Sequence, residues 1–145
     1  MKLDPRRAAE ELLRRETARA QAGALSKSIR EELFNRQLAV ESDTSRLIAV
    51  LCTRRAGKTE MWPRICVMKA LATPKVLIRI WAQSRLRVKQ LLWQPLKLLC
   101  LRHKIEFIAH DTELTLRFPN ASEIRLVGAD RDQSAQRKRG DATVM

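Results

Sequence analysis

The residues of this chain that could do chemistry gather in one short stretch, where Gly57, Lys58 and Thr59 stand together. Residues 47–51 before them are all apolar, and a sequence suited to a helix follows Thr59. An apolar strand, a short loop closed by Gly-Lys-Thr and a helix is the arrangement in which backbone N–H groups converge on phosphate oxygens. Residues 47–59 are therefore predicted to form a phosphate-binding loop of the Walker A type.

Each residue type in this loop has a physical reason to be there. Gly57 lets the backbone approach an anion, because a Cβ at that position would collide with phosphate. Lys58 would reach the β- and γ-phosphates, and the Thr59 hydroxyl would ligate Mg²⁺. The predicted ligands are ATP and Mg²⁺, and the loop residues predicted to hold them are Thr53, Arg54, Arg55, Ala56, Gly57, Lys58 and Thr59.

One position departs from the motif. The pattern G-x-x-x-x-G-K-[ST] has Gly where this chain has Cys52. Cysteine is small enough to leave the turn possible, but the pattern alone is weakened. A chance Gly-Lys-Thr in a chain rich in Lys and Arg is the alternative, and the flanking strand and helix patterns favour the phosphate loop.

The composition favours a polyanionic partner. The chain has 145 residues, enough for one domain, and a net charge of +13. Tyr is absent and aromatic residues make up only 4%, so stacking on single-stranded bases is not indicated. Contacts to nucleic acid would be to phosphate, hence salt-sensitive and weakly sequence-specific. A basic protein without such a partner is the alternative.

Targeting and redox features are few. No apolar run approaches the ~20 residues of a membrane span, and residues 1–7 do not resemble a secretory signal. Cys52, Cys66 and Cys100 are far apart and odd in number. We interpret them as reduced thiols in the cytoplasm, with no zinc site.

The segment before the loop is predicted to be helical and charged. Asp4-Pro5 suits a helix start, residues 22–24 are expected to break that helix, and Ser28-x-x-Glu31 suits a capping box that opens a second one. Residues 1–33 are thus expected to form a charged N-terminal arm. Just beyond it, Gln37 could contact adenine, because its amide offers both a donor and an acceptor.

After the loop, helix and strand patterns alternate. A helix over 59–71, kinked at Pro63, leads to a strand over 75–82 and then to a helix over 85–102, bent at Pro95. A β-hairpin follows, with strands over 113–118 and 123–127, and a further strand is expected to start at 142. Residues 34–145 are therefore predicted to form an α/β domain with a mainly parallel sheet of the P-loop NTPase type, flanked by helices, extended by a hairpin and incomplete at the C-terminus.

Several of these stretches resemble one family, the large terminase subunits that package double-stranded DNA into the heads of tailed phages and herpesviruses. Gln37 and the Arg-rich loop resemble that family's adenine-side Gln and its Walker A segment, which often lacks the first Gly. Residues 80–84 with Gln90 resemble its "A-P-T-x-x-Q" neighbourhood, although Gln83-Ser84 replaces Pro-Thr. Residues 118–130 resemble its "F-P-N-G-S-x-I" hairpin and "G-A-D" ending, and Arg139-Gly140 resembles its "R-G" step. The resemblance runs from about Phe34 to the C-terminus.

The resemblance implies roles for individual residues. Lys58 would be catalytic as well as phosphate-binding, and Arg54 would act in cis on the γ-phosphate, where a cation stabilises the developing charge. Arg55 would be positional, and Gln37 would contact adenine. The implied partners are double-stranded DNA, a portal protein and a small terminase subunit, with a possible homo-oligomeric ring. The implied location is the cytoplasm of a bacterial host, at the portal vertex of the procapsid when assembled.

The family's Walker B aspartate, its catalytic glutamate and its nuclease domain would follow Met145. Without the Walker B acids, Mg²⁺ and the attacking water are poorly held, so we expect this chain to bind ATP but not to hydrolyse it alone. Two alternatives remain: a fragment of a DEAD-box-like helicase, which also combines an upstream Gln with a P-loop, and a non-enzymatic basic protein that binds DNA through charge.

Overall fold

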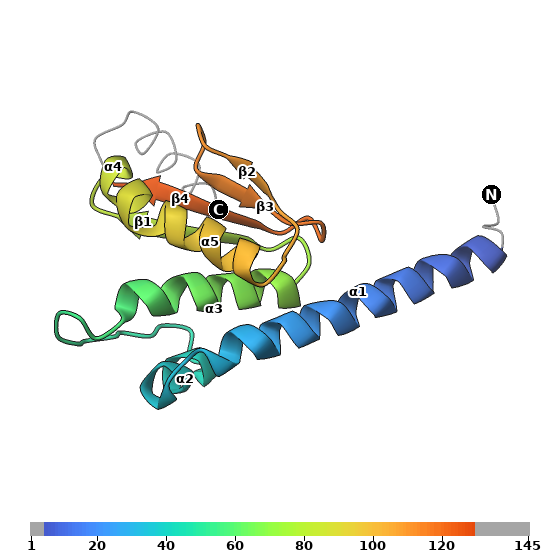
Figure 1. Cartoon of the computed structure of the whole chain (residues 1–145), viewed down its shortest axis with the longest axis horizontal. Helices are drawn as coiled ribbons and strands as arrows, with labels where there is room; N and C mark the ends of the chain where they lie inside the picture. The colour runs from blue at the N-terminus through green and yellow to red at the C-terminus, as the bar shows by residue number, and fades with distance from the viewer. Residues whose placement is uncertain (1–4, 130–145) are drawn as a thin grey trace, which may run out of the picture.

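The computed structural model of this chain describes residues 5–129 (Figure 1). Its elements, in chain order, are α1 (Pro5–Glu31), α2 (Asn35–Ser42), α3 (Lys58–Ala72), β1 (Leu77–Ala82), α4 (Arg85–Val88), the π-helical turn η1 (Lys89–Trp93), α5 (Gln94–Arg102), β2 (Ile108–His110), β3 (Thr115–Arg117) and β4 (Glu123–Gly128). The fold is α/β, with helices packed on a mixed sheet, as the alternating pattern predicts.

The sheet has four strands in the order β1-β4-β3-β2. Only β1 and β4 pair in parallel, whereas β4 with β3 and β3 with β2 are antiparallel. The prediction of a mainly parallel sheet is therefore wrong. Two differences account for this: the expected strand before the loop is absent from the sheet, and the short strand β2, which the sequence did not indicate, adds an antiparallel pair.

The apolar run 47–51 is the clearest departure from the sequence prediction. It forms no strand, and Leu51 is 96% exposed. The run lies between α2 and the start of α3 rather than in the sheet (Figure 1). Apolar, β-branched composition favours a strand only where a neighbouring strand supplies backbone hydrogen bonds, and this run has no such neighbour among the described residues.

The hairpin and its turn are confirmed, although β3 covers only Thr115–Arg117 of the predicted 113–118. Leu114, Leu116, Phe118, Ile124 and Leu126 are all buried, and the chain reverses over residues 119–122. The turn also holds α3, because Asn120 Nδ2 and Ser122 Oγ donate to the Ala70 carbonyl over 2.7 and 2.8 Å. Carbonyls in the last turn of a helix have no partner within it, so these two bonds both cap α3 and join it to the sheet.

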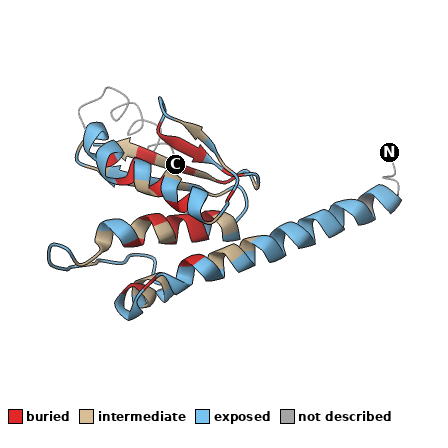
Figure 2. Cartoon of the chain, viewed as in Figure 1, coloured by how far each residue is buried: buried red, intermediate tan, exposed pale blue. Residues whose placement is uncertain are grey.

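The core lies between the sheet and the helices α3 and α5 (Figure 2). Buried apolar side chains of α3 and of the strands belong to one core cluster. Trp93 at the end of η1 is almost completely buried. The Trp93 indole donates to Asp111 over 2.6 Å, so its one polar atom is also satisfied. Gly128 ends β4 where the chain passes close to α4, since a Cβ there would lie 2.1 Å from the Arg85 amide nitrogen.

The N-terminal helix corrects another expectation. α1 runs unbroken for 27 residues, so the predicted break at residues 22–24 is wrong. One Gly in a helix costs only about 1 kcal/mol relative to Ala, and the surrounding Ala, Arg, Glu and Leu residues favour a helix strongly enough to offset it. Ile29 and Leu33 are buried against the body, while most of α1 projects from it (Figure 1).

Both helix-internal prolines are accommodated. Pro63 lies within α3, which remains one continuous helix of 15 residues, so the expected kink does not interrupt it. Pro95 lies at the start of α5, and η1 precedes it directly. A π-helical turn shifts the hydrogen-bond register, which is the local adjustment that a missing N–H requires.

The predicted strand from 142 and the Arg139-Gly140 step lie outside the described residues. Within residues 5–129, no helix combines the length and apolarity that crossing a membrane would need.

Replacing Leu51 and Leu116 by Ala should distinguish an exposed run from a core strand. Leu116→Ala is expected to lower the free energy of unfolding by about 2–5 kcal/mol, because it opens a cavity in the core. Leu51→Ala is expected to change it by less than about 0.5 kcal/mol, because that side chain is in solvent. Urea unfolding of both variants measures the contrast. Comparable large losses would place residues 47–51 in the core.

Candidate nucleotide-phosphate site

The predicted loop ends in a tight left-handed turn. Gly57 has φ 76° and is the N-cap of α3, and Arg55 before it also has positive φ, at 64°. Left-handed backbone is easy for Gly and rare for other residues. The amides of Glu60 and Met61 donate to the Gly57 carbonyl, which starts the helix. The first N–H groups of α3 therefore point out of the helix without partners inside it, as an anion site requires.

The Lys58 side chain joins the end of the loop to residues earlier in the same loop. Its Nζ donates to the carbonyls of Cys52 and Thr53 over 2.9 and 3.2 Å. The Lys58 side chain therefore spans the loop and reaches a carbonyl six residues earlier in the chain. Thr53 contributes to this contact with its backbone carbonyl and not with its side chain. An arriving phosphate would offer the ammonium stronger, charged acceptors than these two carbonyls.

The loop surrounds a hollow of about 770 Å³, which is lined by Arg54, Arg55, Ala56, Gly57, Lys58, Thr59 and Glu60. Three of these side chains are cationic and one is anionic. Arg54, Arg55 and Thr59 are exposed to solvent, so they are accessible to a ligand. Six of the seven lining residues are predicted site residues, and together they form a cationic hollow at a helix N-terminus.

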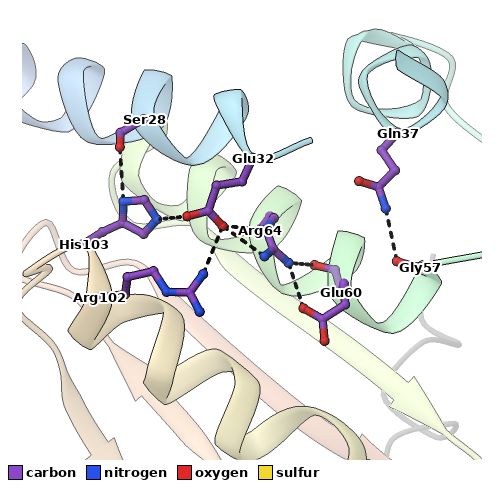
Figure 3. Close-up of polar contacts among 8 residues, drawn as sticks. All are labelled: Ser28, Glu32, Gln37, Gly57, Glu60, Arg64, Arg102 and His103. Atoms are coloured by element: carbon purple, nitrogen blue, oxygen red, sulfur yellow. Dashed lines mark hydrogen bonds and ion pairs between the residues drawn. The ribbon is translucent and has the colours of Figure 1, made fainter. Parts of the chain in front are cut away.

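Gln37 is hydrogen-bonded to the backbone of the loop. Its side chain comes from α2 and is only 6% exposed, and its Nε2 donates to the Gly57 carbonyl over 3.2 Å (Figure 3). A Cβ on Gly57 would lie 2.9 Å from the same Nε2. Gly57 is thus favoured by its positive φ, and a side chain there would also displace the Gln37 amide. The structure shows Gln37 bracing the loop backbone, and its contact with adenine stays a prediction.

The loop fits Mg-ATP in its donor chemistry. The exposed Thr59 hydroxyl is a hard oxygen of the kind that Mg²⁺ prefers, and Mg²⁺ usually takes its remaining ligands from phosphate and water. Within residues 5–129, no three His, Cys, Asp or Glu side chains are grouped so as to hold a metal by themselves.

A polar network next to the loop was not indicated by the sequence. Glu32, which directly follows α1, accepts from Arg64 of α3. It also contacts Arg102, the last residue of α5, and His103, which caps that helix (Figure 3). His103 is bonded in addition to Ser28 over 3.3 Å. Glu32 is 32 positions from Arg64 and 71 from His103, so no local pattern could have connected it with these partners.

Arg64 extends this network to the loop. It contacts Glu60, which lines the hollow, as well as Glu32 (Figure 3). The ionised form of Glu32 is favoured overall. Partial burial by itself would raise the pKa of Glu32, but the hydrogen bonds and charges of Arg64 and His103 outweigh it and bring the pKa below its ordinary value.

The three thiols differ sharply in environment. Cys66 and Cys100 are buried, and burial raises the pKa of each thiol to about 12. Cys52 is exposed within the loop, one position before Thr53. All three are free cysteines.

Comparison of the chain with protein-family models, with curated proteins and with solved structures finds no match in any of the three. The function must therefore be argued from this site.

The Glu32 network should make stability depend on pH in the acidic range. A carboxyl whose pKa is lowered by folding stabilises the native state above its unfolded pKa, near 4.5, and that contribution is lost as the pH falls through the folded value. Glu32→Gln is therefore expected to be less stable at pH 7 and to lose less stability than the wild type between pH 6 and about pH 3. Urea unfolding across this range measures both. The control is Glu106→Gln at an exposed site; equal pH dependence of all three proteins would contradict the prediction.

Thiol titration should find one reactive cysteine. With an aromatic disulfide reagent at pH 8, Cys52 is expected to react fast in the native chain, whereas Cys66 and Cys100 stay protonated and shielded. All three should react in urea. Cys52→Ser should abolish the fast phase, and fast reaction of a second thiol would show that the core is open.

Proposed function

We propose that this chain is the ATP-binding part of a DNA-packaging motor of the large terminase type. The observation that carries the proposal is the junction between loop and helix. A left-handed Gly57 starts α3, and Lys58 lies across the loop. The hollow beside them is lined by Arg54, Arg55 and Thr59, and the Thr59 hydroxyl would coordinate Mg²⁺.

Each loop residue has a binding role in this proposal. The amides from Ala56 to Thr59 hold phosphate oxygens at the positive end of α3. Lys58 leaves the two carbonyls that it now contacts and pairs with the β- and γ-phosphates. Arg54 and Arg55 are exposed at the mouth of the hollow. Arg54 is the one proposed to neutralise charge on the γ-phosphate, and Arg55 to help position the triphosphate.

The P-loop NTPase type of the fold belongs to this proposal as well. It is supported by the loop, by the helix that follows it and by the parallel pair β1–β4. Residues 47–51, which this type of fold would place in a strand, form none in the described structure, so that part of the pattern is not met.

A DNA partner is supported by charge. The net charge is +13, and α1 exposes Arg7, Arg14, Arg15 and Arg19, of which Arg15 is paired with Glu11. Arginines on an exposed helix suit contacts with phosphates of double-stranded DNA. A portal protein and a small subunit are partners proposed from the family resemblance alone.

The same charge supports a second candidate, a non-enzymatic basic protein that binds DNA through phosphate contacts. In that case DNA binding would fall steeply with salt and would be indifferent to ATP and to the identity of residue 58. The hollow at the loop favours the nucleotide-binding proposal, because arginines on α1 do not explain a cationic site at the start of α3.

Binding of Mg-ATP tests the proposal. Titration calorimetry of the full chain is expected to give saturable binding, and Lys58→Ala should weaken it on the order of 10- to 100-fold, because a charge-assisted contact with the phosphates is lost. The matched control is Lys69→Ala, an exposed lysine in the last turn of the same helix, which should bind as the wild type does. A wild-type chain that binds no nucleotide, or equal effects of the two variants, would overturn the proposal.

A further inference from the structure

One residue that lines the hollow carries a negative charge, which is unfavourable for a phosphate site. Glu60 follows Thr59 in the first turn of α3 and lines the hollow beside Lys58. Its side chain is 67% exposed. A carboxylate in this position would repel a triphosphate, and repulsion between charges a few ångströms apart is felt even in water.

Arg64 lies one helical turn further along α3 and makes two hydrogen bonds to Glu60. Its Nη1 donates to the Glu60 carboxylate over 3.0 Å and to the Glu60 carbonyl over 2.6 Å (Figure 3). The carboxylate is therefore paired with a guanidinium that lies one turn further along the helix.

The other side of the same guanidinium is fixed by α1. Nε and Nη2 of Arg64 contact Glu32 over 3.0 and 2.9 Å, and the Arg64 side chain is only 15% exposed. Glu32 in turn is held by His103 over 2.9 Å. The Arg64 guanidinium thus contacts Glu32 through Nε and Nη2 and Glu60 through Nη1, a geometry that a lysine with its single ammonium could not provide.

We infer that Arg64 is a positioning residue for the phosphate site: it holds the Glu60 carboxylate away from the anion that enters the hollow. This inference rests on the proposed nucleotide binding. Arg64 itself does not contact the nucleotide in this proposal. It affects ATP affinity only by pairing with the negative charge of Glu60.

The experiment is a mutant cycle on Mg-ATP affinity in the full chain. Arg64→Ala should weaken binding by about three- to tenfold, because an uncompensated carboxylate then faces the phosphates across solvent-screened space. The double variant Arg64→Ala with Glu60→Gln should restore the affinity to within about twofold of the wild type, and Glu60→Gln alone should change it by no more than about twofold. Rescue by a neutral residue 60 is a result that a general loss of structure would not give.

Arg102→Ala is the matched control. Arg102 also contacts Glu32, over 3.4 Å, but it does not reach Glu60 in the described contacts. It should leave ATP affinity unchanged. Weakened binding by Arg102→Ala equal to that by Arg64→Ala, or a double variant that binds no better than Arg64→Ala, would overturn the inference.

A folding check accompanies the cycle, because Arg64 joins α1 to α3. If Arg64→Ala does not melt cooperatively, Arg64→Lys replaces it; a single ammonium should give a smaller loss of affinity, again removed by Glu60→Gln. No ATP binding by the wild type would defeat the proposed function itself. Normal wild-type binding with no effect of residue 64 would defeat only the role of Arg64.

Discussion

The attachment of α3 to the sheet is the constraint on which the candidate site depends. α3 carries the loop at its N-terminus, and its own position is fixed at the opposite end. There the hairpin turn donates from Asn120 and Ser122 to the Ala70 carbonyl, and α3 buries Val67 and Ala70 completely. These bonds satisfy a carbonyl that the helix cannot satisfy itself, and the hollow lies at the opposite end of α3, where the helix begins. A shift of α3 along its axis would break both arrangements together.

The N-terminal half of the chain then attaches to this helix at two points. Gln37 reaches the Gly57 carbonyl from α2, and Glu32 reaches Arg64 from α1. Both contacts are polar, and both involve atoms next to the loop rather than in the core. The first braces the turn where the helix begins, and the second extends through Arg64 to Glu60. The site is thus built by α3 and steadied by two helices that precede it in the chain.

The sequence was sufficient for much of this fold because local patterns and tertiary packing agree there. The hairpin could be predicted from strict alternation on both sides of Pro119-Asn120. The six loop residues from Arg54 to Thr59 could be placed together because the motif is contiguous. Residues 47–51 could not be placed, since their apolar composition suits a strand but says nothing about whether a neighbouring strand is present.

Other features escaped because they depend on residues far apart in the chain. β2 is too short to show a period, and the contacts of Glu32 with Arg64 and His103 join three helices. The predicted break in α1 failed for a different reason, because one Gly is a weak signal against a long run of helix-forming residues. Local chemistry thus located the loop, whereas the residues that contact it from other helices are brought there by the tertiary structure.

The most direct measurement of the central claim is an amide NMR titration of the full chain with Mg-ATP. If the turn at Gly57 holds the phosphates, the amide signals of residues 54–60 shift first and most, in one saturable step, while those of β2 and β3 stay in place. Saturable shifts confined to another part of the chain, or an unchanged spectrum at millimolar Mg-ATP, would contradict the account.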